Sequence, residues 1–215
     1  METLTEKSTI VYKKPSIGSW ILSGLSHRGK TGTYEAIEEM TPSMTQDNLI
    51  SKYGLQIPST DLVWAIASRG YELRKESPEA SEALRRFLKQ GFRQYLNTST
   101  RIVYTSEGSD RIIHNYGTSD EYSIDEQVVG PDEFVHKLPD QKVLESLLGT
   151  QDVGRINEVS QWVNGTDNHL WRFNSKPKQR EERVARFYAG GYWLYLDCNR
   201  NPHGEYPAFR VLKVE

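Results

Sequence analysis

The order of the periodic segments along the chain is the feature that most narrows its possible folds. Between residues 59 and 95, apolar side chains recur at steps of three and four, the spacing of one face of an α-helix, and Ser59 and Ser77 mark two helix starts. From residue 101 the pattern changes to short β-rich runs separated by turn-forming residues. A parallel α/β protein would instead alternate strands with helices along its length. The sequence therefore predicts an α+β fold, with a helical N-terminal half and an antiparallel C-terminal sheet.

The individual elements are predicted as follows. Helices are expected at residues 59–76, 77–95, 141–148 and 152–162, with weaker ones at 34–40 and 47–52. Strands are expected in RIVYTS, RIIHNYG, LWRFN, RVARFY, YWLYLDC and AFRVLKV. The last of these runs predict an antiparallel meander at the C-terminal end.

Composition limits the kinds of partner. At 215 residues the chain is long enough to bury a core as one domain. Its 27 basic and 29 acidic residues nearly cancel, so no overall attraction to nucleic acid or to an anionic membrane is expected. The single cysteine, Cys198, excludes an intramolecular disulfide and a cysteine-rich zinc site. Without a run of about 18 apolar residues or an export signal, membrane insertion is not expected. The location stays open between the cytoplasm, a surface reached by another route and a virus particle.

A short segment matches the phosphate-loop pattern G-x-x-x-x-G-K-[ST]. It is GLSHRGKT, with the required residues at Gly24, Gly29, Lys30 and Thr31. In a phosphate loop, backbone N–H groups wrap the phosphates, the lysine reaches the outer ones and the hydroxyl holds Mg²⁺. These roles require a buried strand before the loop and a helix that begins at the lysine, and the preceding SWIL is a poor buried strand. A nucleotide-binding enzyme is therefore the alternative function, and a Gly-rich surface loop is the simpler interpretation.

The C-terminal block, residues 183–215, carries the most informative pattern. In its strand after Gly191, the period-two rule puts Leu194, Leu196 and Cys198 on one face, which predicts the core side. The opposite face carries Trp193, Tyr195, Asp197 and Asn199, and the following turn adds Asn201, His203, Glu205 and Tyr206. Rigid amphipathic rings mixed with short polar groups are typical of a recognition surface. A half-buried strand whose aromatic residues pack under a loop explains the same pattern equally well.

The C-terminal block also resembles a known family. It combines ERVARF, an aromatic strand, a cysteine, an N-x-x-P-type turn and the closing PAFRVLKV, and so resembles the variable region of proteins diversified by retroelements. The upstream QWVNGTDNHLWRFNS is similar, more weakly, to C-type lectin-like domains of the formylglycine-generating-enzyme type. The likeness covers residues 161–215. It implies a single C-type lectin-like domain over residues 1–215, with the variable region at about 183–215 and with TIVYKK pairing with FRVLKV.

In that family a reverse transcriptase recopies the 3′ end of the gene with errors at adenines, and the altered side chains form a ligand-binding site. Codons for Tyr, His, Asp and Asn differ only at the first base, so one asparagine codon altered at adenines can give all four. The predicted ligand-binding residues are Tyr188, Tyr192, Trp193, Tyr195, Asp197, Asn199, Asn201, His203, Glu205 and Tyr206. The resemblance implies a non-enzymatic receptor- or adhesin-like protein, without cofactor, that binds a variable ligand such as a protein or a cell-surface molecule.

The sequence departs from the pattern of related proteins in two ways, and one further function competes with ligand binding. The calcium motifs E-P-N and W-N-D are absent, so no Ca²⁺ site is carried over, and the lone Cys198 argues against the paired-cysteine oxidising chemistry of related enzymes. A nucleic-acid contact would use the basic residues Lys176, Lys178, Arg180, Arg183 and Arg186 beside Trp171 and Phe173. Glu181 and Glu182 dilute that patch, and we expect no nucleic-acid partner.

Overall fold

The computed structural model of the chain describes residues 11–14, 18–106, 110–127, 129, 132–171 and 177–214. Its helices are α1 (Gln46–Tyr53), α2 (Thr60–Glu72), α3 (Pro78–Arg93), α4 (Lys142–Leu148) and α5 (Val153–Asn164), with short 3-10 helices η1 (Gly54–Gln56) and η2 (Val135–Lys137). Its strands are β1 (Val11–Lys14), β2 (Ser19–His27), β3 (Lys30–Ile37), β4 (Leu96–Tyr104), β5 (Asp110–His114), β6 (Tyr122–Gln127), β7 (Glu133–Phe134), β8 (Asn168–Trp171), β9 (Glu181–Ala189), β10 (Leu194–Arg200) and β11 (Arg210–Val214). This content confirms the predicted α+β class.

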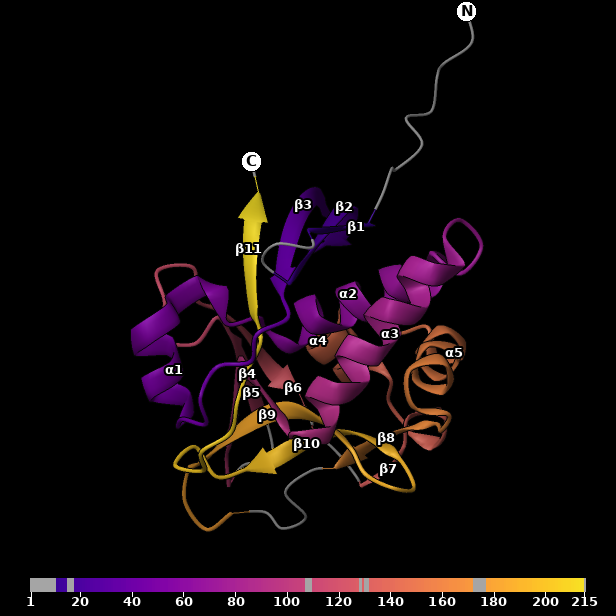
Figure 1. Cartoon of the computed structure of the whole chain (residues 1–215). Helices are drawn as coiled ribbons and strands as arrows, with labels where there is room; N and C mark the ends of the chain where they lie inside the picture. The colour runs from indigo at the N-terminus through magenta and orange to yellow at the C-terminus, as the bar shows by residue number, and fades with distance from the viewer. Residues whose placement is uncertain are drawn as a thin grey trace, which may run out of the picture.

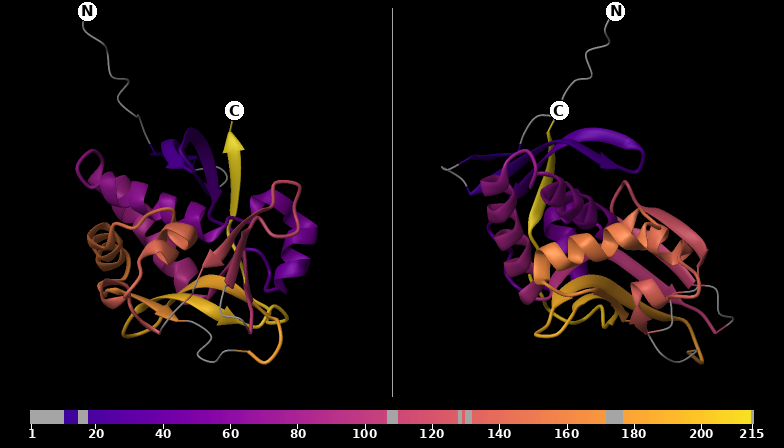
Figure 2. Two further views of the ribbon diagram at one scale, coloured as in Figure 1. Left: turned by 180° about the vertical axis from the view of Figure 1, so that it is seen from behind. Right: turned by 90° about the vertical axis from the view of Figure 1, so that its right-hand side faces the viewer.

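The strands form two sheets with helices between them (Figure 1). The smaller sheet has the order β1-β2-β3-β11 and is antiparallel throughout. The larger sheet has the order β6-β5-β4-β9-β10-β8-β7 and is antiparallel except for the parallel pair of β8 and β10. In the right-hand view of Figure 2 the smaller sheet lies above the helices and the yellow strands β9 and β10 lie below them. The helices therefore cover only one side of β9 and β10.

The two ends of the described chain share the smaller sheet but do not pair with each other. β1, the described part of TIVYKK, pairs with β2, and β11, from FRVLKV, pairs with β3. The predicted direct pairing of these segments is therefore wrong. The β2–β3 hairpin lies between them, and its two strands supply the ladder partners.

Two other local predictions are also wrong. Most of residues 34–40, expected as a weak helix, belongs to β3, because that strand has ladder partners on both sides, and this pairing overrides weak helical propensity. The C-terminal strands do not form one meander. β9 pairs with β10, but β11 crosses to the other sheet.

The strong helix predictions are confirmed. α2 begins directly after Ser59 and α3 has Pro78 in its first turn, as predicted. The side-chain oxygens of Thr45 and Asp152 accept backbone hydrogen bonds at the starts of α1 and α5. Gly165, in the left-handed region at φ +77°, ends α5. Helix boundaries set by such local signals are readable from the sequence.

The centre of the core is a stack of three aromatic rings. Phe187 of β9 lies 6.1 Å from Trp64 of α2 and 5.0 Å from Phe92 of α3, measured between ring centroids. On β10, Leu194, Leu196 and Cys198 are fully buried, which confirms the predicted core face of that strand. Because side chains alternate along a strand, the residues between them point away from the helices.

Gly70 of α2 tests how tightly the helices pack. A Cβ atom at this position would lie 2.6 Å from the ring of Trp162 in α5 and 2.9 Å from Leu84 in α3. We expect Gly70→Ala to lower the free energy of unfolding by about 1–3 kcal/mol through overpacking, although alanine favours a helix. Gly91→Ala in α3 is the matched control, since the nearest side chain packed against its Cβ would be Leu96, at 3.7 Å. Urea unfolding that found Gly70→Ala as stable as Gly91→Ala would contradict this packing.

Candidate functional site

A row of aromatic side chains crosses the outer face of the larger sheet. Phe134 of β7 is the ladder partner of His169 on β8, His169 of Tyr195 on β10, and Tyr195 of Tyr188 on β9. The centroids of successive rings are 5.1, 5.5 and 5.8 Å apart. Tyr95, directly before β4, stacks on Tyr188 at 3.8 Å and extends the row. These separations are near or within the range of attractive aromatic pairs.

Three further rings widen this row. The Trp193 ring lies 5.0 Å from His169, nearly parallel to it, Trp171 lies 5.5 Å from Tyr195, and Tyr206 lies 5.7 Å from Tyr95. We call the whole set the aromatic face, and its residues are Tyr95, Phe134, His169, Trp171, Tyr188, Trp193, Tyr195 and Tyr206.

The aromatic face is open to solvent at its centre and at one end. Trp171 and Trp193 are 42% and 37% exposed, and the adjoining Tyr192 is 83% exposed. Only one other large apolar side chain is exposed among the residues that the structure describes, so such side chains are concentrated here. A concentration of exposed aromatic area marks an interaction surface. Figure 1 shows the helices on the opposite side of β9 and β10, where they leave this face uncovered.

His169, Tyr188 and Tyr195 of the aromatic face are neutral near pH 7. Burial lowers the pKa of His169, which favours the uncharged imidazole stacked against Trp193. A hydrogen bond with Tyr95 raises the pKa of Tyr188, and burial raises that of Tyr195. The face therefore offers rings and uncharged hydrogen-bonding groups rather than ionic ones.

Asp197 is not displayed on this face, contrary to the sequence prediction. It is the ladder partner of Arg186, and both side chains are buried, with Arg186 Nε 3.3 Å from Asp197 Oδ2. Arg200 Nε donates to the same oxygen at 2.6 Å. The ring of Tyr206 lies over the Arg186 guanidinium at 4.0 Å, and burial lowers the pKa of Arg186. The period-two rule gave Asp197 the correct face but could not show what covers it.

The other predicted residues lie at or near the surface. Asn199 is half-buried, whereas Asn201, His203 and Glu205 are exposed in the turn after β10. Asn201 Oδ1 accepts a hydrogen bond from the His203 backbone at 2.9 Å, which shapes this turn. Tyr206 then joins the turn to the aromatic face through its contact with Tyr95.

The predicted ligand-binding residues omit four members of the aromatic face: Tyr95, Phe134, His169 and Trp171, the last of which was named only for the nucleic-acid alternative. Each lies upstream of the predicted variable region and reaches it only through strand pairing or ring stacking. Tyr95 has a φ of +61°, which is uncommon for a bulky residue and indicates local strain. No signal in the sequence marks this conformation.

The GLSHRGKT segment forms a β-hairpin. β2 ends at His27 and β3 begins at Lys30, with Arg28 and Gly29 at φ +52° and +67° as the two turn residues. Two successive positive φ angles are the signature of a type I′ hairpin turn. A phosphate loop requires a helix that begins at the lysine, and Lys30 instead opens a strand. The strand–loop–helix geometry that the nucleotide-binding alternative needs is therefore contradicted for this segment.

The arginines of the basic link at residues 176–186, which was predicted as a competing nucleic-acid contact, are paired with carboxylates or buried. Arg180 pairs with Glu182 at 2.6 Å, Arg183 pairs with Glu181 at 2.9 Å, and Arg186 is buried beside Asp197. Two members of that patch, Lys176 and Phe173, lie outside the described residues. The described part of the link offers few free cations to a phosphate backbone.

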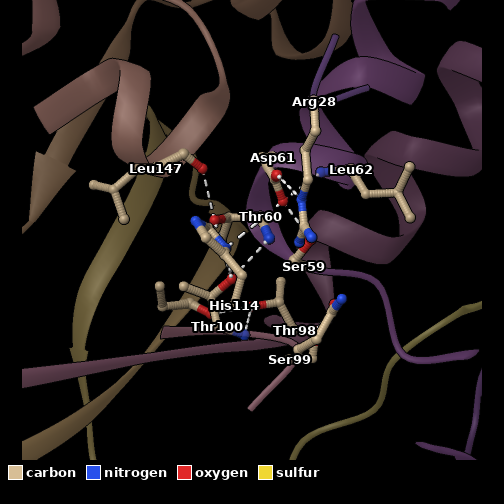
Figure 3. Close-up of polar contacts among 12 residues, drawn as sticks. Arg28, Ser59, Thr60, Asp61, Leu62, Thr98, Ser99, Thr100, His114 and Leu147 are labelled. Carbon is tan, nitrogen blue, oxygen red and sulfur yellow. Dashed lines mark hydrogen bonds and ion pairs between the residues drawn. The ribbon is translucent and has the colours of Figure 1, made fainter. Parts of the chain in front are cut away.

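A second polar centre, which the sequence did not indicate, surrounds the buried Asp61 at the start of α2 (Figure 3). Asp61 Oδ2 accepts hydrogen bonds from Tyr122 Oη at 2.9 Å and from Arg28 Nε at 3.2 Å, and lies 2.8 Å from His27 Nε2. The Ser59 hydroxyl bonds the other carboxylate oxygen. Burial by itself would raise the pKa of Asp61, but the hydrogen bonds from His27 and Ser59 hold it well below its usual range. The cluster joins the β2–β3 hairpin, α2 and β6.

His114 lies beside this carboxylate and is fully buried. Its Nδ1 is 2.9 Å from Thr100 Oγ1 and its Nε2 is 2.7 Å from the carbonyl oxygen of Ser146. Thr60 donates to the carbonyl of Leu147 in the same network (Figure 3). Burial lowers the pKa of His114, so the ring is neutral. Since both of its nitrogens are engaged, His114 offers no free base, and we interpret the centre as structural.

Comparisons with known proteins gave no match to a family model, to a curated protein or to a solved structure. Within the described residues, no group of three or more His, Cys, Asp or Glu side chains could hold a metal ion. No helix in that part of the chain has the length and apolarity needed to cross a bilayer. The functional argument therefore depends on the geometry of the aromatic face.

The Asp61 cluster predicts a pH dependence of stability. Because the pKa of Asp61 is lower in the folded than in the unfolded chain, the unfolded chain takes up the proton first as the pH falls. Its stabilising contribution is complete above about pH 4 and is lost progressively below it. We expect Asp61→Asn to lower the free energy of unfolding by about 3–5 kcal/mol at pH 7, and the difference from the wild type to shrink below pH 4. A constant difference in urea unfolding from pH 7 to pH 3 would contradict this assignment.

Asp197 provides a second test, because it was predicted as a display residue and is buried. We expect Asp197→Asn to lower the free energy of unfolding by about 3 kcal/mol, since Arg186 keeps a buried charge without its partner. Asn201→Asp, at an exposed position in the following turn, is the control and should change it by less than about 0.5 kcal/mol. Equal stability of the two variants in chemical denaturation would contradict the burial of Asp197 and support its prediction as a surface ligand-binding residue.

Proposed function

We propose that this protein is a non-enzymatic ligand-binding protein, of the receptor or adhesin kind, and that the aromatic face is its site. We also propose that the domain is C-type lectin-like and that a retroelement diversifies its surface residues through adenine-directed mutagenesis. The observation that carries the proposal is the registered row of rings across four strands, with Tyr192 and Trp193 exposed beside it.

The physical case begins with rigidity. Tyr and Trp side chains have few rotatable bonds, so they offer large contact area at a small cost in conformational entropy. Here each ring in the row is also held by its neighbours, with Tyr188 between Tyr95 and Tyr195. A surface ordered before binding loses less entropy when a ligand arrives, which favours affinity.

The second argument is the separation of scaffold from display. Along β10, the fully buried Leu194 and Leu196 flank the half-exposed Tyr195. Substitutions at Tyr195 therefore change the surface without opening the core, while substitutions at its two neighbours create cavities. A protein whose binding residues are altered by mutagenesis needs core residues that are separate from the residues on the binding surface.

The chemistry of the face also favours a class of ligand. It is broad, rich in aromatic area and uncharged near pH 7, which suits a protein or another cell-surface molecule. A nucleic-acid ligand would require free cations to meet its phosphates. The described arginines of the nearby link are paired or buried.

The nucleotide sequence around the gene tests the diversification directly. We expect a near-copy of the 3′ end of the gene close to a reverse-transcriptase gene, differing only where the copy carries adenines. The affected codons should include those of exposed residues such as Tyr192 and His203. The absence of such a copy, or alleles that vary as much at Leu194 or Val211 as at Tyr195, would overturn this part of the proposal.

The separation of scaffold from display can be measured without knowing the ligand. We expect Tyr192→Ala and His203→Ala to change the free energy of unfolding by less than about 0.5 kcal/mol, because both side chains are exposed. Leu196→Ala should lower it by about 2–5 kcal/mol, because that side chain is fully buried. Urea unfolding that found similar losses for all three would show that the turn and face are part of the core.

A further inference from the structure

The β2–β3 hairpin borders a hollow, and none of the residues that line it belongs to the aromatic face. Its volume is about 340 Å³, and it lies between this hairpin, β11, η1 and the loop after β5. It contains much of the GLSHRGKT segment, including Arg28, Lys30 and Thr31. Volumes near 300 Å³ and above are typical of small-molecule sites.

Positive charge dominates the walls of this hollow. Lys30, Lys213 and Arg28 line it, and the only carboxylate in its described lining is that of Asp120. Within the part of the chain that the structure describes, neither Lys30 nor Lys213 forms an ion pair. Arg28 is held in place, because its Nε donates to Asp61 and its guanidinium lies 3.4 Å from the centre of the Tyr122 ring.

Strand register explains why both lysines lie on the same face of the smaller sheet. Lys30 and Tyr34 are four residues apart on β3 and so share one face of the sheet, and Lys213 on β11 is the ladder partner of Tyr34. Tyr34 is buried in the core, so this is the face turned toward the helices. Lys30 and Lys213 thus both belong to the inner face of the sheet, and both are exposed where the apolar core ends.

An apolar wall completes the hollow. Leu55 of η1 is 49% exposed, and it is the one exposed large apolar side chain of the described residues that lies away from the aromatic face. Leu62 and Val211 line the same hollow and are buried. An apolar wall beside unpaired ammonium groups matches a ligand that has an apolar body and a negative group.

We propose that this hollow binds a small organic anion, in which a carboxylate or phosphate is carried on an apolar body. The anionic group meets Lys30 and Lys213, with the fixed guanidinium of Arg28 beside them, and the apolar body rests on Leu55. The site lies apart from the aromatic face, so this inference does not depend on the function proposed above.

A second explanation for the lysines on this sheet, that they prevent aggregation, has to be distinguished from anion binding by experiment. β11 is an edge strand, and inward-pointing lysines on edge strands prevent sheets of different molecules from joining. That role could account for Lys213 and also for Lys30, because β11 pairs with β3 only at residues 33–37 and leaves Lys30 beyond the end of that ladder. It predicts self-association of a lysine variant and no effect on a small anion.

The experiment is a titration of ¹⁵N-labelled protein with four probes, followed by ¹H–¹⁵N NMR. Phenyl phosphate and benzoate carry both features, inorganic phosphate carries only the charge, and benzyl alcohol carries only the ring. We expect at least one aromatic anion to cause saturable shifts at the amides of Lys30, Leu55 and Lys213, with an affinity about tenfold above that of inorganic phosphate and benzyl alcohol. Benzoate or phenyl phosphate, whichever binds more tightly, identifies the preferred anionic group.

A pair of charge-matched double variants completes the test. K30Q/K213Q should weaken binding of the preferred probe about tenfold, whereas K75Q/K142Q, which removes two exposed lysines elsewhere, should leave it unchanged. Thermal unfolding checks that both variants fold. Shifts outside the hollow, equal binding of benzyl alcohol, or self-association of K30Q/K213Q without any loss of probe binding would each overturn the proposal.

Discussion

The packing of Phe187 against Trp64 and Phe92 is the contact on which the arrangement of the aromatic face depends. It places one face of β9 against α2 and α3, and the ladder then fixes the buried face of β10, β8 and β7. A slip of one residue would turn every side chain of a strand to the opposite face. Tyr195 would then enter the core and Leu196 would meet water, so burial of these few apolar residues keeps the aromatic side chains outside.

Two buried carboxylates serve as joints between distant parts of the chain. Asp61 connects the β2–β3 hairpin to α2 and β6, and Asp197 pairs with the buried Arg186 of β9 and with the partly exposed Arg200 of β10. Removing Asp197 leaves the buried Arg186 cation without compensation, which is more costly than losing an exposed pair. The Tyr95 and Tyr206 end of the aromatic face therefore packs on the buried Arg186, which Asp197 holds in place.

The sequence predicts what local signals determine. The helices that follow Ser59 and Ser77 are found where their caps and periodicity indicate, and the alternation of β10 gives its core face correctly. Prediction fails where the deciding partner is distant. Tyr34 lies in a strand because β2 and β11 flank it, and Asp197 is buried because Arg186 lies opposite. Tyr95 joins the candidate site through a backbone conformation that no local pattern reveals.

The path of the chain after the turn at residues 201–206 has a consequence for gene expression. After β10 the chain leaves the larger sheet, and β11 completes the smaller one. Phe209, just before β11, is fully buried, and its ring centroid lies 5.2 Å from that of Phe87. A message that shifts frame or stops anywhere between residues 188 and 206 cannot encode this strand. Its product has an open edge at β3 and a gap in the core where Phe209 packs. Such products lack burial and strand pairing that the full-length chain has, so we expect them to be less stable than products with an intact reading frame.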